Sequence, residues 1–125
     1  MDHSTFLDAA ENGDFDVVKQ MVESGTPADS KDEHERTALY KAAKHGHKDI
    51  VEYLIENGAD VNYMDNRGTT AIYWAALNNH VEIVRLLLSK GAKTDITDDR
   101  GWSILDHAKS NGQNEIIKSL EAVLA

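Results

Sequence analysis

Hydrophobic positions recur along this chain at a constant interval of 33 residues. A pair of small residues returns once per interval, and only the last copy replaces its second Ala: Ala9-Ala10, Ala42-Ala43, Ala75-Ala76 and Ala108-Lys109. A large apolar residue precedes each pair at the same distance: Phe6, Leu39, Ile72 and Leu105. A fixed period of this length is typical of repeat proteins. Because one repeat cannot bury its own apolar face, the pattern predicts a solenoid of stacked repeats.

Each 33-residue row is expected to contain two helices. The first helix follows a Ser or Thr that can serve as its N-cap, at Ser4, Thr37, Thr70 and Ser103. The second helix has an acidic residue in its first turn and apolar residues at helical spacing, which predicts one buried face. Turns rich in Asp, Asn and Gly join the rows. We therefore predict an all-α chain, one domain over residues 1–125, with rows at about 1–31, 32–64, 65–97 and 98–125.

The second row closely resembles the ankyrin repeat, from Thr-Ala-Leu-Tyr at 37–40 to Gly-Ala-Asp-Val-Asn at 58–62. The resemblance covers essentially the whole chain and implies an ankyrin-repeat solenoid with hairpin loops between helix pairs. It also implies that Asn62 braces a hairpin. Two features depart from the family, which has Thr-Pro-Leu-His where this chain lacks the Pro and places Tyr40, Tyr73 and Asp106 in the His column. We expect these departures to lower stability without changing the fold.

The outer rows carry polar residues in columns that are apolar in the inner rows. The column of Tyr53 and Leu86 holds Gln20 in the first row and Ser119 in the last. Such substitutions are expected where no neighbouring repeat stacks. They predict that the outer rows act as caps, that four rows make up the protein, and that the chain is a monomer.

The amino-acid composition indicates which classes of partner and which cellular compartment to expect. The net charge is −9, so a nucleic acid is an unfavourable partner. The chain has no cysteine, which excludes disulfides and thiolate metal sites and suits a reducing compartment. No apolar run approaches the length of a membrane span, and the N-terminus lacks the pattern of a signal peptide. We expect an intracellular, cytoplasmic protein that does not bind membranes, with the nucleus left open.

No arrangement of residues indicates catalysis. Asp106 and His107 are adjacent, but adjacent helix residues point in different directions and do not orient each other. His45, His47 and His80 lack ligands at a diagnostic metal-binding spacing, and the resemblance makes His47 and His80 structural residues of the turn. We expect no catalytic residue, cofactor or metal.

The ankyrin resemblance implies a concave groove formed by the hairpin tips and the first helices. The partner-binding residues that it predicts are Arg36, Lys44, Arg67, Thr69, Trp74, Leu77, Asn78, Arg100, Trp102 and Asn111. Both Trp residues stand in columns that are polar in the other rows, and Trp is enriched at interface hot spots. The alternatives are that Trp102 covers the end of the stack and that Trp74 packs across the hairpin stems.

Two arginines occupy equivalent points of successive hairpins. Arg67 and Arg100 would lie roughly 10 Å apart if the hairpins follow the spacing of packed helices. They could form a ladder toward an acidic segment of a partner. The alternative is that they are solvated or paired with Asp65, Asp98 and Asp99, and such surface pairs contribute only about 0–1 kcal/mol.

The favoured function is a protein–protein interaction module, an adaptor or inhibitor that binds another protein through the concave face. Two other classes stay open. One is an enzyme or small-molecule binder that uses the groove, which requires a deep pocket with a perturbed titratable group. The other is a self-associating structural unit.

Overall fold

The computed structural model describes residues 3–124 and contains eight helices in four antiparallel pairs. Their bounds are α1 His3–Asn12, α2 Phe15–Glu23, α3 Ala38–Lys44, α4 Lys48–Glu56, α5 Ala71–Leu77, α6 Val81–Ser89, α7 Ile104–Ser110 and α8 Asn114–Leu124. Within this part of the chain, extended structure is limited to isolated bridges at the stems of two loops, Lys31 with Thr37 and Thr97 with Ser103. The all-α prediction is confirmed.

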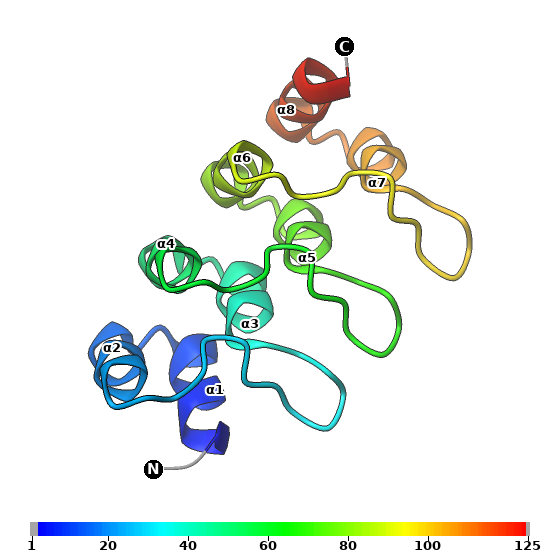
Figure 1. Cartoon of the computed structure of the whole chain (residues 1–125). Coiled ribbons are helices and arrows are strands. Elements are labelled where there is room, and N and C mark those ends of the chain that lie inside the picture. Colours follow the sequence, from blue (N-terminus) through cyan, green and yellow to red (C-terminus); the bar gives the residue numbers. More distant parts are fainter. Residues whose placement is uncertain (1–2, 125) are drawn as a thin grey trace.

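The helices form two parallel rows. The inner row stacks α1, α3, α5 and α7, and the outer row stacks α2, α4, α6 and α8 (Figure 1). Three loops project from the inner row on the same side of the stack (Figure 1). We call residues 31–37, 64–70 and 97–103 the first, second and third hairpins. The hairpins and the inner row therefore share one side of the molecule.

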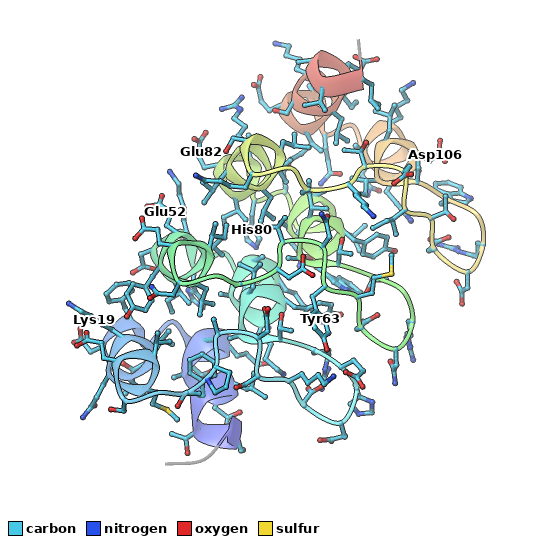
Figure 2. The ribbon with its side chains drawn as sticks, viewed as in Figure 1. Lys19, Glu52, Tyr63, His80, Glu82 and Asp106 are labelled. Carbon is cyan, nitrogen blue, oxygen red and sulfur yellow. The ribbon has the colours of Figure 1, made fainter. Side chains whose placement is uncertain are left out.

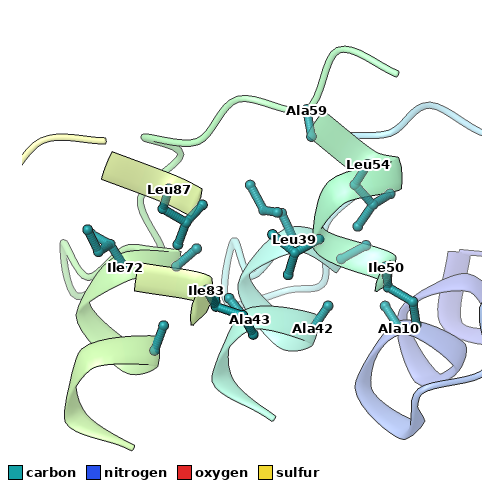
Figure 3. Close-up of a cluster of buried hydrophobic side chains, with 14 of the residues drawn as sticks. Ala10, Leu39, Ala42, Ala43, Ile50, Leu54, Ala59, Ile72, Ile83 and Leu87 are labelled. Carbon is teal, nitrogen blue, oxygen red and sulfur yellow. The ribbon is translucent and has the colours of Figure 1, made fainter. Parts of the chain in front are cut away.

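Small residues in the inner row allow this close stacking. Ala42 and Ala43 are fully buried, and so are Ala10 and Ala75, so at these positions small methyl groups let neighbouring inner helices approach closely. Large apolar side chains fill the space between the two rows (Figure 3): Leu39, Ile50, Leu54, Ile72 and Leu87. Truncating a buried residue of this kind to Ala typically costs about 2–5 kcal/mol. Leu105 is only half-buried, because no further inner helix stacks beyond α7.

Helix caps follow the sequence pattern with two exceptions. Thr37 accepts the Tyr40 amide at 3.2 Å, and Ser103 forms a capping box with Asp106. Ser4 lies inside α1, which already begins at His3, so it is not a cap. The Thr70 hydroxyl is buried and has no hydrogen-bond partner among the described residues.

Two histidines tie consecutive helix pairs together. The Nε2 atom of His47 lies 2.8 Å from the carbonyl oxygen of Glu11, and that of His80 lies 3.0 Å from the carbonyl oxygen of Lys44. Each ring covers a glycine of the preceding pair; a Cβ on Gly46 would lie 2.8 Å from the His80 ring. The structural interpretation of both histidines is therefore confirmed.

Asn62 links one repeat to the loop of the next. Its amide donates to the carbonyl oxygen of Gly91 at 3.3 Å, and its Oδ1 atom accepts the Lys93 amide at 2.8 Å. These bonds join consecutive repeats at a loop outside the three hairpins, which differs from the hairpin brace that the family resemblance implied.

The outer row is largely polar, and the exposed Val123 and Leu124 lie at the C-terminal end of α8. Lys19, Glu52 and Glu82 lie on the outer helices with exposed side chains (Figure 2). Gln20 in the first repeat is exposed, as expected for a terminal repeat, whereas Ser119 in the last is part-exposed and accepts a hydrogen bond from Nε of Arg85 at 3.3 Å. Glu121 in the last repeat is exposed. No helix in residues 3–124 has the length and apolar character needed to cross a bilayer.

Candidate functional site

An aspartate at the base of each hairpin holds its backbone in place. Asp32, Asp65 and Asp98 occupy the same column, and the Oδ1 atom of each accepts the amides of the residues two and four positions later at 2.9–3.0 Å. These amides belong to His34 and Arg36, to Arg67 and Thr69, and to Arg100 and Trp102. The aspartate thus fixes the backbone of the residues that the hairpin presents to solvent.

The second oxygen of each aspartate has a different partner in each hairpin. In the first hairpin, Asp32 binds the Arg36 guanidinium at 2.8 Å and has the Lys41 ammonium at 3.4 Å. In the third, Asp98 lies 2.8 Å from Nε2 of His107. Both anions therefore face nitrogen atoms of basic side chains.

In the second hairpin the partners are hydroxyl groups. Thr69 donates to Oδ2 of Asp65 at 2.7 Å, and Tyr40, from the preceding helix pair, donates to it at 2.9 Å. Trp74 in turn donates its indole N–H to the Thr69 hydroxyl at 3.0 Å. Tyr40 thereby takes a role that differs from the family's His, since it links α3 to the next hairpin.

This arrangement shows where two of the predicted contact residues lie. Thr69 is buried, with its hydroxyl engaged by Asp65 and Trp74, so it supports the groove from beneath and is not available to a partner. Trp74 packs across the hairpin stem, as one of the two alternatives predicted. Its column also contains Lys41 and His107, which reach the aspartates of their own hairpins, so all three side chains brace a hairpin.

The aspartates are charged at neutral pH and engaged in structure. Burial alone would raise the pKa of Asp65, but hydrogen bonds from Thr69, Tyr40 and the Arg67 amide outweigh it, and the pKa lies below its usual value. The same opposition, with Arg36 and the His34 amide as donors, lowers the pKa of Asp32 to about 2. Burial raises the pKa of Tyr40 to about 12. These groups hold the hairpins and are not poised for proton transfer near neutral pH.

Aromatic rings form a continuous line along the groove. Tyr40 and Trp74 have ring centroids 6.4 Å apart, Trp74 and Tyr73 5.1 Å, Tyr73 and His107 5.7 Å, and His107 and Trp102 5.1 Å. We call these five residues the aromatic strip. It spans α3, α5, α7 and the third hairpin. Trp102 is the most open end of the strip, with 39% of its surface exposed.

A cation lies over each indole of the strip. The Lys44 ammonium is 4.4 Å from the Trp74 ring centroid, and the Arg100 guanidinium is 5.7 Å from that of Trp102. A cation over an indole face is attracted by about 0.5–1 kcal/mol at an exposed site. The groove therefore combines aromatic surface with positive charge.

The structure gathers four predicted contact residues around one depression between the first and second hairpins. This central pocket, of about 270 Å³, is lined by His34, Arg36, Tyr40, Lys44, Asp65, Asn66, Arg67 and Trp74. No ion pair among residues 3–124 involves Arg67 or Lys44.

The other predicted residues lie outside the central pocket. Arg100 and Trp102 are on the third hairpin, where the Arg100 guanidinium is 4.0 Å from Asp98. Asn111 is exposed at the C-terminal end of α7, and Leu77 is half-buried in α5. The side-chain Nδ2 group of Asn78 donates to the carbonyl oxygen of Lys44 at 3.0 Å, and this bond links the C-terminal ends of α3 and α5.

The remaining candidates for chemistry have structural partners. Asp106 accepts the Ser103 amide and His107 contacts Asp98, so these neighbours do not face each other. His45 lies 3.8 Å from Glu11. Among residues 3–124, no three His, Asp or Glu side chains are grouped in a way that could hold a metal ion.

Comparison with protein families decides the classification. The family model described as "Ankyrin repeats (3 copies)" matches residues 6–98 and, in an overlapping match, residues 68–122. The chain belongs to the ankyrin repeat family. This confirms the ankyrin-repeat solenoid, and ankyrin repeats are generally protein–protein interaction modules. No curated protein matches the chain.

Sequence reasoning missed the residues that hold the hairpins of this ankyrin chain. Tyr40, Tyr73 and the three hairpin aspartates were not among the predicted site residues. A signal was present, because the column of Asp32, Asp65 and Asp98 precedes the column of Lys41, Trp74 and His107 by the same distance in each of the three rows that contain a hairpin. Reading those two columns together would have indicated a repeated contact between hairpin and helix.

Proposed function

We propose that this ankyrin repeat chain is an adaptor or inhibitor that binds another protein through the face formed by the hairpins and inner helices. The observation that carries the proposal is the pair of indoles on this face, Trp74 and Trp102, each with a cation over its ring and joined by the aromatic strip beneath. Trp, Tyr and Arg are the residues enriched at binding hot spots.

The hairpins are suited to binding because their shape is fixed before a partner arrives. Two backbone N–H groups of each hairpin donate hydrogen bonds to its aspartate. In the second hairpin this aspartate, Asp65, is buried. A surface that is already ordered loses less conformational entropy on association. Side chains such as Arg67 and Trp102 are therefore presented from rigid positions.

The alternative classes have less support. The carboxylates of this face, Asp32, Asp65 and Asp98, each bind their own hairpin, so the geometry favours recognition over acid–base chemistry. Exposed polar side chains in the terminal repeats, Gln20 and Glu121, favour a monomer over end-to-end association, while Val123 and Leu124 in α8 are exposed apolar residues. The cysteine-free composition suits the proposed cytoplasmic location.

The test is affinity capture from a lysate of the source cell with the full chain as bait, followed by mass spectrometry. The groove variant carries Arg67→Ala, Arg100→Ala and Trp102→Ala. The matched control carries Lys19→Ala, Glu52→Ala and Glu82→Ala on the outer row. We expect a protein that the wild type and the control retain and the groove variant loses. Equal retention by all three baits would place the interface elsewhere.

A further inference from the structure

The central pocket has a charge opposite to that of the protein as a whole. The chain carries a net charge of −9, whereas this pocket is lined by Arg36, Lys44 and Arg67 with Asp65 as the single acid. Even when Asp32, the partner of Arg36, is counted with Asp65, the cations are in excess. The pocket is therefore a local source of positive potential on an acidic protein.

The carboxylate of Asp65, the acid in this pocket, already accepts as many hydrogen bonds as it can. Asp65 is 8% exposed, and its two oxygens accept four hydrogen bonds, from the Arg67 and Thr69 amides and from the Thr69 and Tyr40 hydroxyls. A carboxylate has about four acceptor positions, so none remains for the side chains of Lys44 or Arg67. Both cations are left to face solvent without an anion.

The two uncompensated cations border an apolar floor. Lys44 extends over the Trp74 ring at 4.4 Å, Tyr40 packs edge-on against the same ring, and Arg67 comes from the hairpin opposite. A carboxylate side chain has a matching construction, since its aliphatic stem can lie on an aromatic ring while its charged end accepts from Lys and Arg. Such charge-assisted hydrogen bonds are roughly twice as strong as neutral ones.

The neighbouring depression provides a contrast. It has a volume of about 380 Å³ and is lined by Ser4, Leu7, Asp8, Lys31, Asp32, Glu33, Arg36 and Lys41. Its lysines are paired, Lys31 with Glu35 at 2.8 Å and Lys41 with Asp32 at 3.4 Å, and the Glu33 side chain is 84% exposed. Acids and bases balance in this lining, so it has no excess of positive charge to attract an anion, unlike the central pocket.

We infer that the central pocket receives an Asp or Glu side chain from an acidic segment of the partner protein, bound between Arg67 and Lys44 above Trp74. This inference rests on the proposed function and specifies the partner's chemistry at one point of the groove. Arg67 supplies the main contact because its guanidinium can bind a carboxylate through two parallel hydrogen bonds.

The test uses the full chain and a displayed library of random, unmodified 12-residue peptides. Enriched peptides are expected to share an Asp or Glu next to an apolar residue. The best peptide is then synthesised with its acid intact and with the corresponding amide, Glu→Gln or Asp→Asn. Binding is followed by the fluorescence anisotropy of a labelled peptide, so that both Trp residues of the chain stay in place.

The two peptides are compared on four proteins: the parent, Arg67→Gln, Lys44→Gln and the matched control Glu33→Gln. On the parent and on Glu33→Gln, the amide peptide is expected to bind about tenfold more weakly than the acid. On Arg67→Gln that difference should shrink to less than about threefold, because the partner charge is gone. Unfolding curves verify that the variants are folded.

The outcomes separate the two claims. Peptides that bind, and that Trp102→Ala weakens, but that show no acid preference or no coupling to Arg67, overturn the inference and leave groove binding standing. A library that yields no binder, or binders indifferent to both Trp102→Ala and Arg67→Gln, overturns the inference and the proposed function together.

Discussion

The first and second hairpins are both held by an aspartate, but different side chains bind its second carboxylate oxygen. Both place an aspartate beneath the turn and use one of its oxygens to hold two backbone amides. In the first hairpin the other oxygen is neutralised by Arg36 and Lys41. In the second it is satisfied by the hydroxyls of Tyr40 and Thr69.

The difference shows how a repeat array can keep its framework and change its surface. In the first hairpin the positive charges of Arg36 and Lys41 are paired with Asp32 within the protein. Because neutral hydroxyls hold Asp65 in the second hairpin, Arg67 and Lys44 are free of internal anions. The type of buried residue that binds the hairpin aspartate thus determines whether nearby cations are left unpaired at the surface.

The largest effect should come from removing the second aspartate. Asp65→Ala leaves the buried hydroxyls of Tyr40 and Thr69 without their acceptor, and each buried unsatisfied group costs about 1–3 kcal/mol. We expect a loss of about 3 kcal/mol in the free energy of unfolding, measured by urea denaturation. Asp32→Ala should cost less, because Arg36 and Lys41 can extend into water. Equal losses would contradict the distinction between the two hairpins.

Acid should weaken both hairpins within a defined range of pH. The pKa of Asp32 is about 2 in the folded protein against an ordinary value of 3.8, and the pKa of Asp65 is also lowered. Between these values the unfolded chain binds more protons, so the stabilisation is complete above about pH 4 and falls as the pH drops toward 2. Urea midpoints measured from pH 7 to pH 2 should show this fall.

The matched variants for this range are Asp32→Asn and Glu33→Gln. Asp32→Asn should make the decline below pH 4 shallower, because it removes a group whose pKa changes on folding. Glu33→Gln removes the same charge from an exposed side chain of the same hairpin and controls for net charge. A decline of the same slope in Asp32→Asn and wild type would refute the assignment.

The third hairpin extends the comparison to binding. Trp102 occupies the column of Arg36 and Thr69 but makes no hydrogen bond to its aspartate with its side chain, and it packs on the ring of His107 instead. We expect Trp102→Ala to weaken partner binding by at least tenfold and to leave the melting temperature nearly unchanged. A large drop in melting temperature would identify Trp102 as a cap of the stack.

The smallest change in stability is expected for the arginine of the second hairpin. Arg67→Gln removes no ion pair and should alter the free energy of unfolding by less than about 0.5 kcal/mol. Arg36→Gln breaks a partly buried pair with Asp32 and should cost about 1 kcal/mol. Parallel urea titrations of the two variants give the comparison. A larger loss for Arg67→Gln would mean that its charge has a structural role.

Much of the fold was predictable because it depends on residues close in sequence. The caps Thr37 and Ser103 and the buried Ala42-Ala43 pair follow from local preference and from the 33-residue period. The site was less predictable. Thr69 and Trp74 carry the residue types of a contact surface, but one is buried and the other also braces a hairpin.

The sequence by itself determined the repeat, its helix pairs, its polar ends and the identity of the family, because periodicity and helix propensity act within one row. Tertiary structure alone decided that a group from another helix pair meets a hairpin aspartate. The bond between Tyr40 and Asp65 joins residues of different helix pairs, and it exists because the small residues of the inner row bring those pairs close together. Arg36 is paired within its own hairpin, whereas hydroxyl groups, one of them from another helix pair, occupy Asp65 and leave Arg67 without an internal anion.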